Sequence, residues 1–520
     1  MPALVSFLLV VLAAAPLASA QDASAQDHAK LGIALAKSGS LSEAERELRQ
    51  AVQLAPTVAP FRAHLGSVQG LQGKWAQALE NFRTAVDLAP ENMAFRRETA
   101  AVQWQLGLMS DAEKNLRYVL GKQPDDPGAV LLLGLVKEKT GDYAAAAELL
   151  DSQFDLATAQ PDRAIAFFHS AVEAHQEEKV AKVIDALQRR SQDQPWANAI
   201  ARCTEIAAKT GDLETSRALF ALIPENGPHR AVVGILLAKL LYSHNLPAQA
   251  RDLLLQLAHQ GAVSADLQTL LGSCYEAEHQ PRLALEAYIH AIEADPSRID
   301  SYEDPVSLLL QSGRSVDALK LIGQALAVAP NDPRPWLWKG NASLRMHVYD
   351  EAIQSYTRAG TLDAANADAV LGVAAVYFAS GKSDAAMAEY KRGMAKFPED
   401  ARFYVACATI LLGSSESPSF SEEGQNLLRK AVQLDPQSAE AHHQLGQWAM
   451  QQNRLKDAEK EFLLSLRANP DRSKTHFALS VVYRRMGRTE DAGRQFAIYQ
   501  DLKQSEESGM TTAMAPAENP

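Results

Sequence analysis

Residues 265–298 read ADLQTLLGSCYEAEHQPRLALEAYIHAIEADPSR, and the spacing of residues inside this stretch decides the fold. Ala284 lies four residues before Tyr288, so the two side chains share one face of a helix. Two closely crossing helices need such a pair, because the small side chain lets the backbones approach and the large one fills the remaining space. Pro296 then ends the helix, since proline lacks an amide hydrogen and clashes with the preceding turn.

The same pattern recurs with a period of 34 residues through most of the chain. A proline closes the period at Pro56, Pro90, Pro124, Pro296, Pro330, Pro398, Pro436 and Pro470. Twelve positions earlier stands a small residue, at Ala44, Ala78, Ala112, Ala146, Ala250, Ala284, Ala318, Ala352, Ala386, Gly424, Ala458 and Ala492. Five positions before the small residue stands a glycine or asparagine in most repeats, and His279 and His347 in two others. Glycine and asparagine tolerate the left-handed backbone that ends a helix, so each period predicts two helices joined by a turn.

These positions resemble the tetratricopeptide repeat. In the repeat that starts at Ala265 they are occupied by Leu271, Gly272, Tyr275, Ala284, Tyr288, Ala291 and Pro296. The family forms hairpins of two helices, here named helix A before the glycine position and helix B after it. The resemblance implies an all-α fold, a right-handed α-solenoid (superhelix) of about fourteen helix-turn-helix repeats.

The pattern also predicts how the chain is divided. Residues 25–160 hold repeats 1–4, and residues 231–506 hold repeats 7–14 with a loop insertion near residues 413–422. Between them, residues 161–230 fit two degenerate repeats, and a separate inserted domain is the alternative. Residues 507–520 are polar, contain proline and lack the period, which predicts disorder.

Residues 1–20, MPALVSFLLVVLAAAPLASA, predict a signal peptide. Their apolar run is followed by Pro16 and by small residues at Ala18 and Ala20, the layout of a secretory cleavage site. No Lys or Arg precedes the run, and an uncleaved N-terminal membrane anchor is the alternative. Cleavage after Ala20 would give an exported protein, periplasmic or secreted, with no membrane span left.

Composition and motifs narrow the class of function. The 520 residues carry 51 Lys and Arg against 63 Asp and Glu, a net charge of −12 that argues against nucleic acid as the main partner. No two of the 13 histidines lie three or four residues apart, so no helix face offers a paired zinc site. The motifs of serine hydrolases, zinc proteases and phosphate-binding loops do not occur in the sequence. We therefore expect no enzyme, metal or cofactor. The weaker alternative is a hidden site in residues 160–230, which has only His169, Glu173 and His175 to draw on.

Positions within a repeat are counted from its first residue, which is Ala265 in the repeat quoted above. In the family that the repeats resemble, helix A positions 2, 5, 9 and 12 line a concave groove. That register, placed on this chain, selects aromatic, cationic and polar candidates for partner contact: Arg97, Trp104, Lys239, Tyr242, Asn341, Phe378, His443, Phe477 and Arg484. The same register includes Leu131, Leu135, Leu337, Leu344 and Leu371. Aromatic side chains beside cations suit a protein or peptide partner, bound as an extended peptide or an amphipathic helix.

Two specialised recognition modes of the family do not match. The carboxylate clamp needs lysine at position 5, where the first four repeats hold Ala29, Ala63, Arg97 and Leu131. The asparagine ladder needs repeated asparagines at position 9, where only Asn341 is found.

The leading hypothesis is therefore a non-catalytic scaffold or adaptor for protein partners. The alternative is an accessory subunit of an envelope enzyme or of a polysaccharide synthesis or export complex. The sequence does not indicate an oligomeric state.

Overall fold

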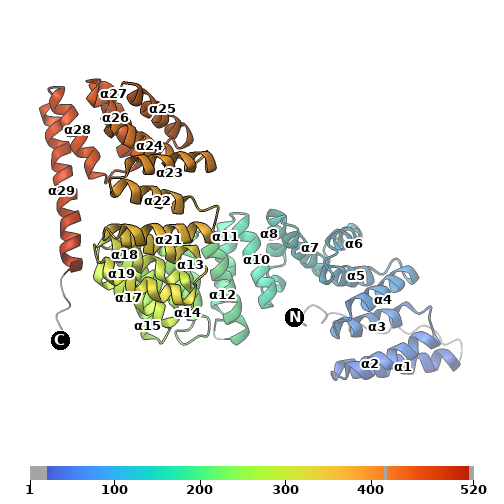
Figure 1. Cartoon of the computed structure of the whole chain (residues 1–520). Coiled ribbons are helices and arrows are strands. Elements are labelled where there is room, and N and C mark those ends of the chain that lie inside the picture. Colours follow the sequence, from blue (N-terminus) through green and yellow to red (C-terminus); the bar gives the residue numbers. More distant parts are fainter. Residues whose placement is uncertain (1–19, 192, 415–417, 515–520) are drawn as a thin grey trace. The chain divides into compact units, whose positions relative to one another are not determined.

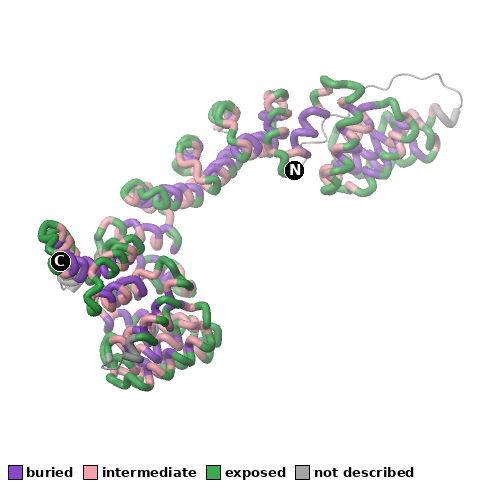
Figure 2. Tube along the Cα trace, turned by 90° about the horizontal axis from the view of Figure 1, so that it is seen from above, coloured by how far each residue is buried: buried purple, intermediate pink, exposed green. Residues whose placement is uncertain are grey.

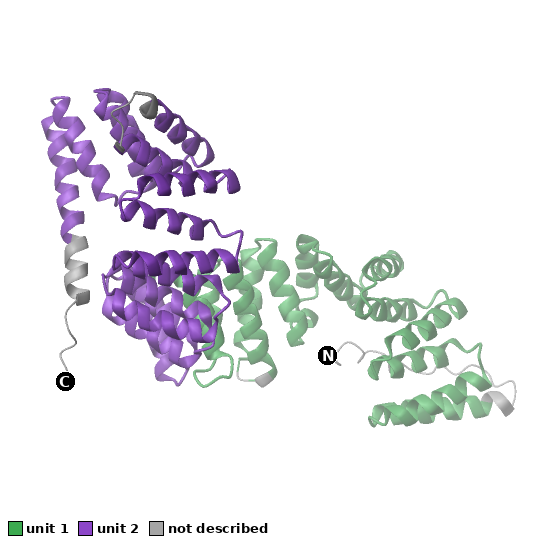
Figure 3. Ribbon diagram, in the orientation of Figure 1, with its two compact units in different colours: residues 1–246 green, residues 247–520 purple. Residues whose placement is uncertain are grey.

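The computed structural model describes residues 20–191, 193–414 and 418–514, and over these ranges the chain forms helices and no β-strand (Figure 1). Apart from Ala20, the predicted signal peptide lies outside the described residues. Successive helices pair into hairpins, so the chain is an all-α solenoid. It divides into two compact units, residues 1–246 and residues 247–520 (Figure 3).

The first compact unit contains four regular hairpins followed by a less regular region. Its helices are α1 (Ala20–Lys37), α2 (Leu41–Leu54), α3 (Ala59–Leu71), α4 (Trp75–Leu88), α5 (Met93–Gln105), α6 (Met109–Lys122), α7 (Pro127–Lys139), α8 (Tyr143–Ser152), α9 (Phe154–Ala157), α10 (Pro161–Glu173), α11 (Glu177–Gln188), α12 (Gln194–Lys209), α13 (Leu213–Ala221) and α14 (Arg230–Ser243).

The second compact unit begins with a helix B and continues with complete hairpins. Its helices are α15 (Pro247–His259), α16 (Ala265–Ala277), α17 (Pro281–Ala294), the 3-10 helix η1 (Ile299–Tyr302), α18 (Glu303–Gln311), α19 (Ser315–Val328), α20 (Pro333–Arg345), α21 (Tyr349–Leu362), α22 (Ala367–Ala379), α23 (Ser383–Lys396), α24 (Ala401–Ser414), α25 (Pro418–Leu434), α26 (Ala439–Gln451), α27 (Leu455–Ala468), α28 (Ser473–Arg485) and α29 (Thr489–Met514).

Each hairpin closes through the small residues that the sequence marks. Ala284 on α17 has no exposed surface, and Tyr288 on the same helix is only 1% exposed. A Cβ added at Gly272 on the facing helix α16 would lie 2.4 Å from Cε1 of Tyr288, so the ring occupies the space that a side chain would need. The ladder alanines on the other B helices are buried as well: Ala44, Ala78, Ala112, Ala146, Ala250, Ala318, Ala352, Ala386, Ala458 and Ala492. Figure 2 shows in purple the buried segments of the helices within each unit.

The turn between helix A and helix B requires a left-handed residue. At Gly73 the backbone φ is +75°, and the amide of the next residue, Lys74, donates to the carbonyl of Gln69 at 2.8 Å. This hydrogen bond satisfies one of the last carbonyls of helix A. His279 and His347 take the same conformation, with φ of 57° and 59°, and so does His175, one period after Gly141, with φ of 54°.

A second recurring contact joins the end of one repeat to helix A of the next. The side chain at helix A position 4 meets the carbonyl oxygen of the proline six residues earlier. The residues in this position are Arg96, Tyr302, Trp336, Tyr404, His442 and His476. Six side chains of four chemical types therefore supply the same hydrogen bond, with lengths from 2.7 to 3.3 Å.

Residues 161–230 form two further helical hairpins, α10–α11 and α12–α13, rather than a different kind of fold. Here α10 packs directly against α12 as well as against its own partner α11. Helix α12 has 16 residues where α3, α5, α7 and α10 have 13, so the irregular region absorbs its extra residues at the start of this helix.

The insertion near residues 413–422 is not a simple loop. Helix α24 continues to Ser414, and α25 begins at Pro418, three residues before the point that the repeat pattern predicts. Helix α25 has 17 residues where α2, α4 and α6 have 14, and because the three added residues stand at its start, the later residues keep their face. Leu428, at the bulky position of this helix, is accordingly fully buried.

The C-terminal prediction also needs correction. Disorder was predicted from residue 507, but α29 extends to Met514. No proline interrupts residues 489–514, and the first proline beyond them is Pro516. Residues 515–520 of the predicted disordered tail lie outside the described residues.

The close crossing predicts the effect of one added methyl group. Gly272→Ala should lower the local stability of α16 and α17 by about 1–3 kcal/mol, because Tyr288 must move to make room. Hydrogen exchange of the amides in these two helices measures this loss. The matched control is Gly323→Ala on α19, where an added Cβ meets no atom within 4 Å. Equal effects of the two substitutions would contradict the close crossing.

Candidate partner-binding surface

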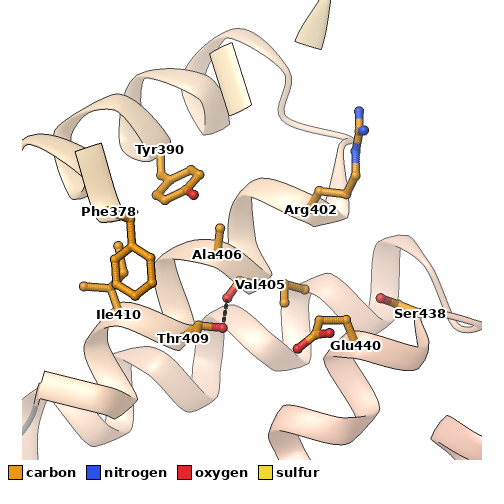
Figure 4. Close-up of a pocket in the computed structure, with 9 residues that line it drawn as sticks. All are labelled: Phe378, Tyr390, Arg402, Val405, Ala406, Thr409, Ile410, Ser438 and Glu440. Atoms are coloured by element: carbon orange, nitrogen blue, oxygen red, sulfur yellow. Dashed lines mark hydrogen bonds between the residues drawn. The ribbon is translucent and has the colours of Figure 1, made fainter. Parts of the chain in front are cut away.

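The helices A of the second compact unit present a pocket of about 320 Å³ between α22, α23, α24 and α26 (Figure 4). Its lining residues are Phe378, Tyr390, Arg402, Val405, Ala406, Thr409, Ile410, Ser438 and Glu440. Five of these hold positions 2, 5, 9 or 12 of helix A in three successive repeats: Phe378, Arg402, Val405, Thr409 and Glu440. The pocket therefore lies on the surface that the repeat register marks for partner contact.

One end of the pocket is apolar. Phe378 from α22 is 47% exposed and lies beside Ile410 from α24 in Figure 4. Val405 and Ala406 continue the apolar lining along α24. The hydroxyl of Thr409 donates to the carbonyl of Val405 at 2.9 Å, so this polar group is satisfied within its own helix. An exposed aromatic ring on an apolar wall offers surface that a partner can bury.

Arg402 stands at the opposite, charged end. Its guanidinium donates to the carboxylate of Asp400 at 2.7 Å and also to Asp368 of the preceding helix A. The hydrogen bond from Arg402 lowers the pKa of Asp400 below its ordinary value, although burial opposes this. The paired carboxylates hold the guanidinium in place and neutralise its charge.

Glu440 supplies a carboxylate at the same end of the pocket. It accepts a hydrogen bond from Gln444 at 2.8 Å and forms an ion pair with Arg472. Burial raises the pKa of Glu440, but the hydrogen bond from Gln444 and the charge of Arg472 outweigh burial, so the pKa is lowered overall. The side chain is therefore ionised at neutral pH.

Arg402, Val405, Thr409 and Glu440 were not among the sequence candidates. The signal for them was present, because they occupy positions 2, 5 and 9 of the repeat starting at Ala401 and position 2 of the repeat starting at Ala439. An insertion follows α24, so the 34-residue spacing is interrupted in the repeat to which Arg402, Val405 and Thr409 belong.

Several sequence candidates are exposed. Phe477, 46% exposed, and Arg484 lie on α28, while Lys239 and Tyr242 lie on α14 of the first compact unit. Asn341 on α20 is exposed too, but its side-chain oxygen accepts a hydrogen bond from Tyr356. The structure thus distributes the exposed candidates over both compact units and brings only Phe378 into the pocket.

Other candidates are engaged by neighbouring repeats. Arg97 and Trp104 on α5 are half-buried, and the guanidinium of Arg97 donates to Asp126 at 2.8 Å. Asp126 in turn caps α7 by accepting from the amide of Ala129. Leu131 and Leu135 on α7 are buried. Position 5 in these two repeats therefore serves packing between helices.

The prediction that His443 lines the groove is wrong. Its side chain is 2% exposed, its Nδ1 lies 2.8 Å from the hydroxyl of Thr475, and its ring packs against Phe462 with centroids 5.6 Å apart. Burial lowers the pKa of His443 to about 4, and the charge of Arg472 adds to this effect. The side chain at position 5 of this repeat therefore lies between α26 and α28 and does not face the groove.

The neighbouring His442 has the opposite titration behaviour. Its Nδ1 lies 2.7 Å from the carboxylate of Glu461, and its Nε2 lies 3.2 Å from the carbonyl of Pro436. The hydrogen bond to Glu461 raises the pKa of His442 above its ordinary value, although burial opposes this. Both ring nitrogens face acceptors, an arrangement that favours the protonated ring.

Groups that could perform chemistry are sparse in the described part of the chain. Within it, no cluster of His, Cys, Asp or Glu is able to hold a metal ion, and no helix is long and apolar enough to cross a membrane. Cys203, Cys274 and Cys407 are buried, and burial raises the pKa of Cys274 and of Cys407 to about 11. Thiols of this kind are poor nucleophiles at neutral pH.

Comparison with known families supports the repeat assignment. One tetratricopeptide-repeat model matches residues 65–127, 104–155 and 306–369, and a second matches residues 344–410 and 422–474. Tetratricopeptide repeat protein 8 of Caenorhabditis elegans is 23% identical to this chain over 176 residues, 34% of each protein. The match thus spans about a third of that relative's length.

Solved structures resemble the chain at low sequence identity. Yeast Tom70 is 15% identical, with 88% of this chain and 94% of that chain covered and a TM-score of 0.43. Naa15/Naa10 bound to HypK is 12% identical, with 93% and 94% covered and a TM-score of 0.36. MamA is 16% identical, with 32% and 96% covered and a TM-score of 0.27. These likenesses carry no information on what this chain binds.

The titration of His442 predicts a pH-dependent contribution to stability. Because the folded pKa lies above the unfolded one, the contribution is complete below the unfolded pKa and disappears as the pH rises through the folded pKa. His442→Gln should therefore destabilise the protein more at about pH 6 than at about pH 8. Urea unfolding of both proteins at the two pH values measures the difference. In a Glu461→Gln background the pH dependence should become smaller, because the largest cause of the raised pKa is removed, and an unchanged pH dependence there would contradict the assignment to this pair.

Proposed function

We propose that this chain, which contains tetratricopeptide repeats, is a non-catalytic scaffold or adaptor. It holds a segment of a partner protein on the surface that helix A positions 2, 5, 9 and 12 form in the second compact unit, here called the inner surface. The observation that supports this most is the pocket at Phe378. Apolar side chains from α22 and α24 and charged ones from α24 and α26 converge there from separate repeats.

The chemistry of the pocket suits a peptide segment. A half-exposed aromatic side chain in an apolar hollow is typical of the few contacts that dominate protein interfaces. At the other end, Arg402 and Glu440 are each paired within the chain, and they present a polar edge to which backbone or side-chain groups of a segment can form hydrogen bonds. An apolar end and a polar end together would fix the direction in which a segment lies.

We favour the role of a scaffold for protein partners over the role of an accessory subunit of an envelope enzyme or polysaccharide complex. The described residues show no feature specific to a glycan or to a synthase, whereas the exposed aromatic ring of Phe378 is a feature typical of protein contact.

The pocket is tested with peptides selected from a displayed random library against the full chain. Phe378→Ala should weaken the selected peptides by about tenfold or more in fluorescence anisotropy, because it removes the ring that they bury. The matched control is Leu463→Ala on α27, which removes a side chain of similar exposure, 46%, from a helix B of the same unit. Selected peptides that bind both variants as tightly as the unchanged chain would contradict the proposal.

We also propose that the chain is exported, on the strength of the pattern in residues 1–20. Expression in a bacterial host should yield a soluble periplasmic protein whose N-terminal sequence begins at Gln21. A protein that keeps Met1 and fractionates with membranes would support the anchor instead.

A further inference from the structure

Helix α28, the helix A of the last hairpin, differs in charge from the chain as a whole. Between Ser473 and Arg485 this helix carries Lys474, Arg484 and Arg485 and no Asp or Glu residue, a net charge of +3. The whole chain has a net charge of −12. A basic segment in an acidic protein marks a place where an anionic molecule can bind while the remainder repels it.

Two cations of this hairpin are unpaired. Arg472 pairs with Glu440, and Arg488 pairs with Glu459 and Asp491. In contrast, Lys474 and Arg484 on α28 are exposed and form no ion pair with any described residue. Their charges are therefore available to a partner, without the cost of breaking an existing pair.

An exposed aromatic ring lies between these cations. Phe477 is 46% exposed and packs against Tyr499 of α29, with ring centroids 5.2 Å apart. Because residues 474, 477 and 484 are separated by three and seven positions, they lie along one face of α28. The three side chains hold positions 2, 5 and 12, the register of the pocket residues in the preceding repeats.

Tyr499 departs from the residue type that earlier repeats carry at its position. The equivalent position in the preceding repeats is small and buried: Ala291, Ala325, Ala359, Gly393, Ala431 and Ser465. At Gly393 an added Cβ would lie 2.1 Å from the ring of Phe403 on the next helix A, which explains why the position must be small. At position 499 the larger ring of Tyr499 packs against Phe477.

We propose that the inner face of α28 binds an acidic peptide segment in which two carboxylates flank an apolar or aromatic residue. Lys474 and Arg484 are ten residues apart, a separation of about 15 Å along the helix axis. An extended peptide covers that distance in about five residues, at roughly 3.3 Å each. One carboxylate would pair with Lys474, the apolar side chain would stack on Phe477 about one turn further on, and the second carboxylate would pair with Arg484.

A peptide fits these observations better than a polyanion. Anionic membranes and nucleic acids are bound through clusters of several free cations, whereas this face offers two at a defined separation with a ring between them. The inference rests on the proposed scaffold function, since it names the chemistry of a segment held on the same inner surface.

The test uses the full chain and a fluorescein-labelled peptide of sequence GSESFSEGS, in which the two glutamates and the phenylalanine lie on one face of an extended chain. Fluorescence anisotropy should show binding that weakens with added salt and that falls about tenfold or more when both glutamates are replaced by glutamine. The double substitution Lys474→Glu with Arg484→Glu should abolish binding, and Phe477→Ala should weaken it. The matched control, Lys114→Glu with Lys122→Glu on α6, makes the same charge change at two other exposed, unpaired lysines and should leave binding unchanged.

Several outcomes would overturn the inference. Failure of the peptide to bind, equal binding of the glutamine peptide, or an equal loss in the α6 control would each do so. Phosphatidylserine vesicles or single-stranded DNA that bind through Lys474 and Arg484 while the peptide does not would do so as well. Loss of the selected peptides in the Phe378→Ala variant tests the pocket, and loss of this probe in the Lys474→Glu with Arg484→Glu variant tests α28, so a failure of the proposed function and a failure of this inference are measured with different ligands.

Discussion

The structure depends on the close approach of two helices at a position without a side chain. Tyr356 illustrates it, because an added Cβ at Gly340 or at Gly372 would lie 2.7 Å and 2.4 Å from its ring. One aromatic side chain is thus packed between its own hairpin and the next. Packing of this kind is the main source of stability in repeat proteins, since each repeat buries its apolar face only against its neighbours. The inner surface, with the pocket at Phe378, exists because these crossings set the helices A side by side.

The fold could be predicted because its determinants are residue types with narrow physical roles. Each hairpin is marked by four of them: an alanine at the helix crossing, a large residue one turn later, a glycine in the turn and a proline at the end. Each of these residues is compatible with few backbone conformations or packing arrangements, so together they predict where each hairpin begins and ends. His175, His279 and His347 show the limit of that reasoning, because they adopt a backbone conformation that favours glycine. The contact to the proline carbonyl could not be predicted either, since Arg, Tyr, Trp and His all make it and no single residue type marks it.

The candidate site was predicted less well than the fold. The register identified Phe378 and the exposed face of α28, because helix A positions alternate in a regular way between the inner surface and the core. It misplaced His443, since the same position faces solvent in one repeat and the neighbouring helix in another. Whether a position is open depends on how tightly two hairpins pack, and that follows from many side chains together. The pocket residues of α24 were missed for a different reason, because an insertion obscured the repeat to which they belong.

The two departures from the 34-residue period occupy similar places. Helix α12 and helix α25 are both lengthened at their first turn, ahead of the residues that make the crossing. Each residue turns a helix by about 100°, so two residues inserted in the middle of a helix would rotate everything after them by about 200°. The buried alanine face would then point away from its partner. Added at the start of a helix, the same residues leave the remaining helix in phase, which means that hairpins of this kind can change length while their inner surface stays in register.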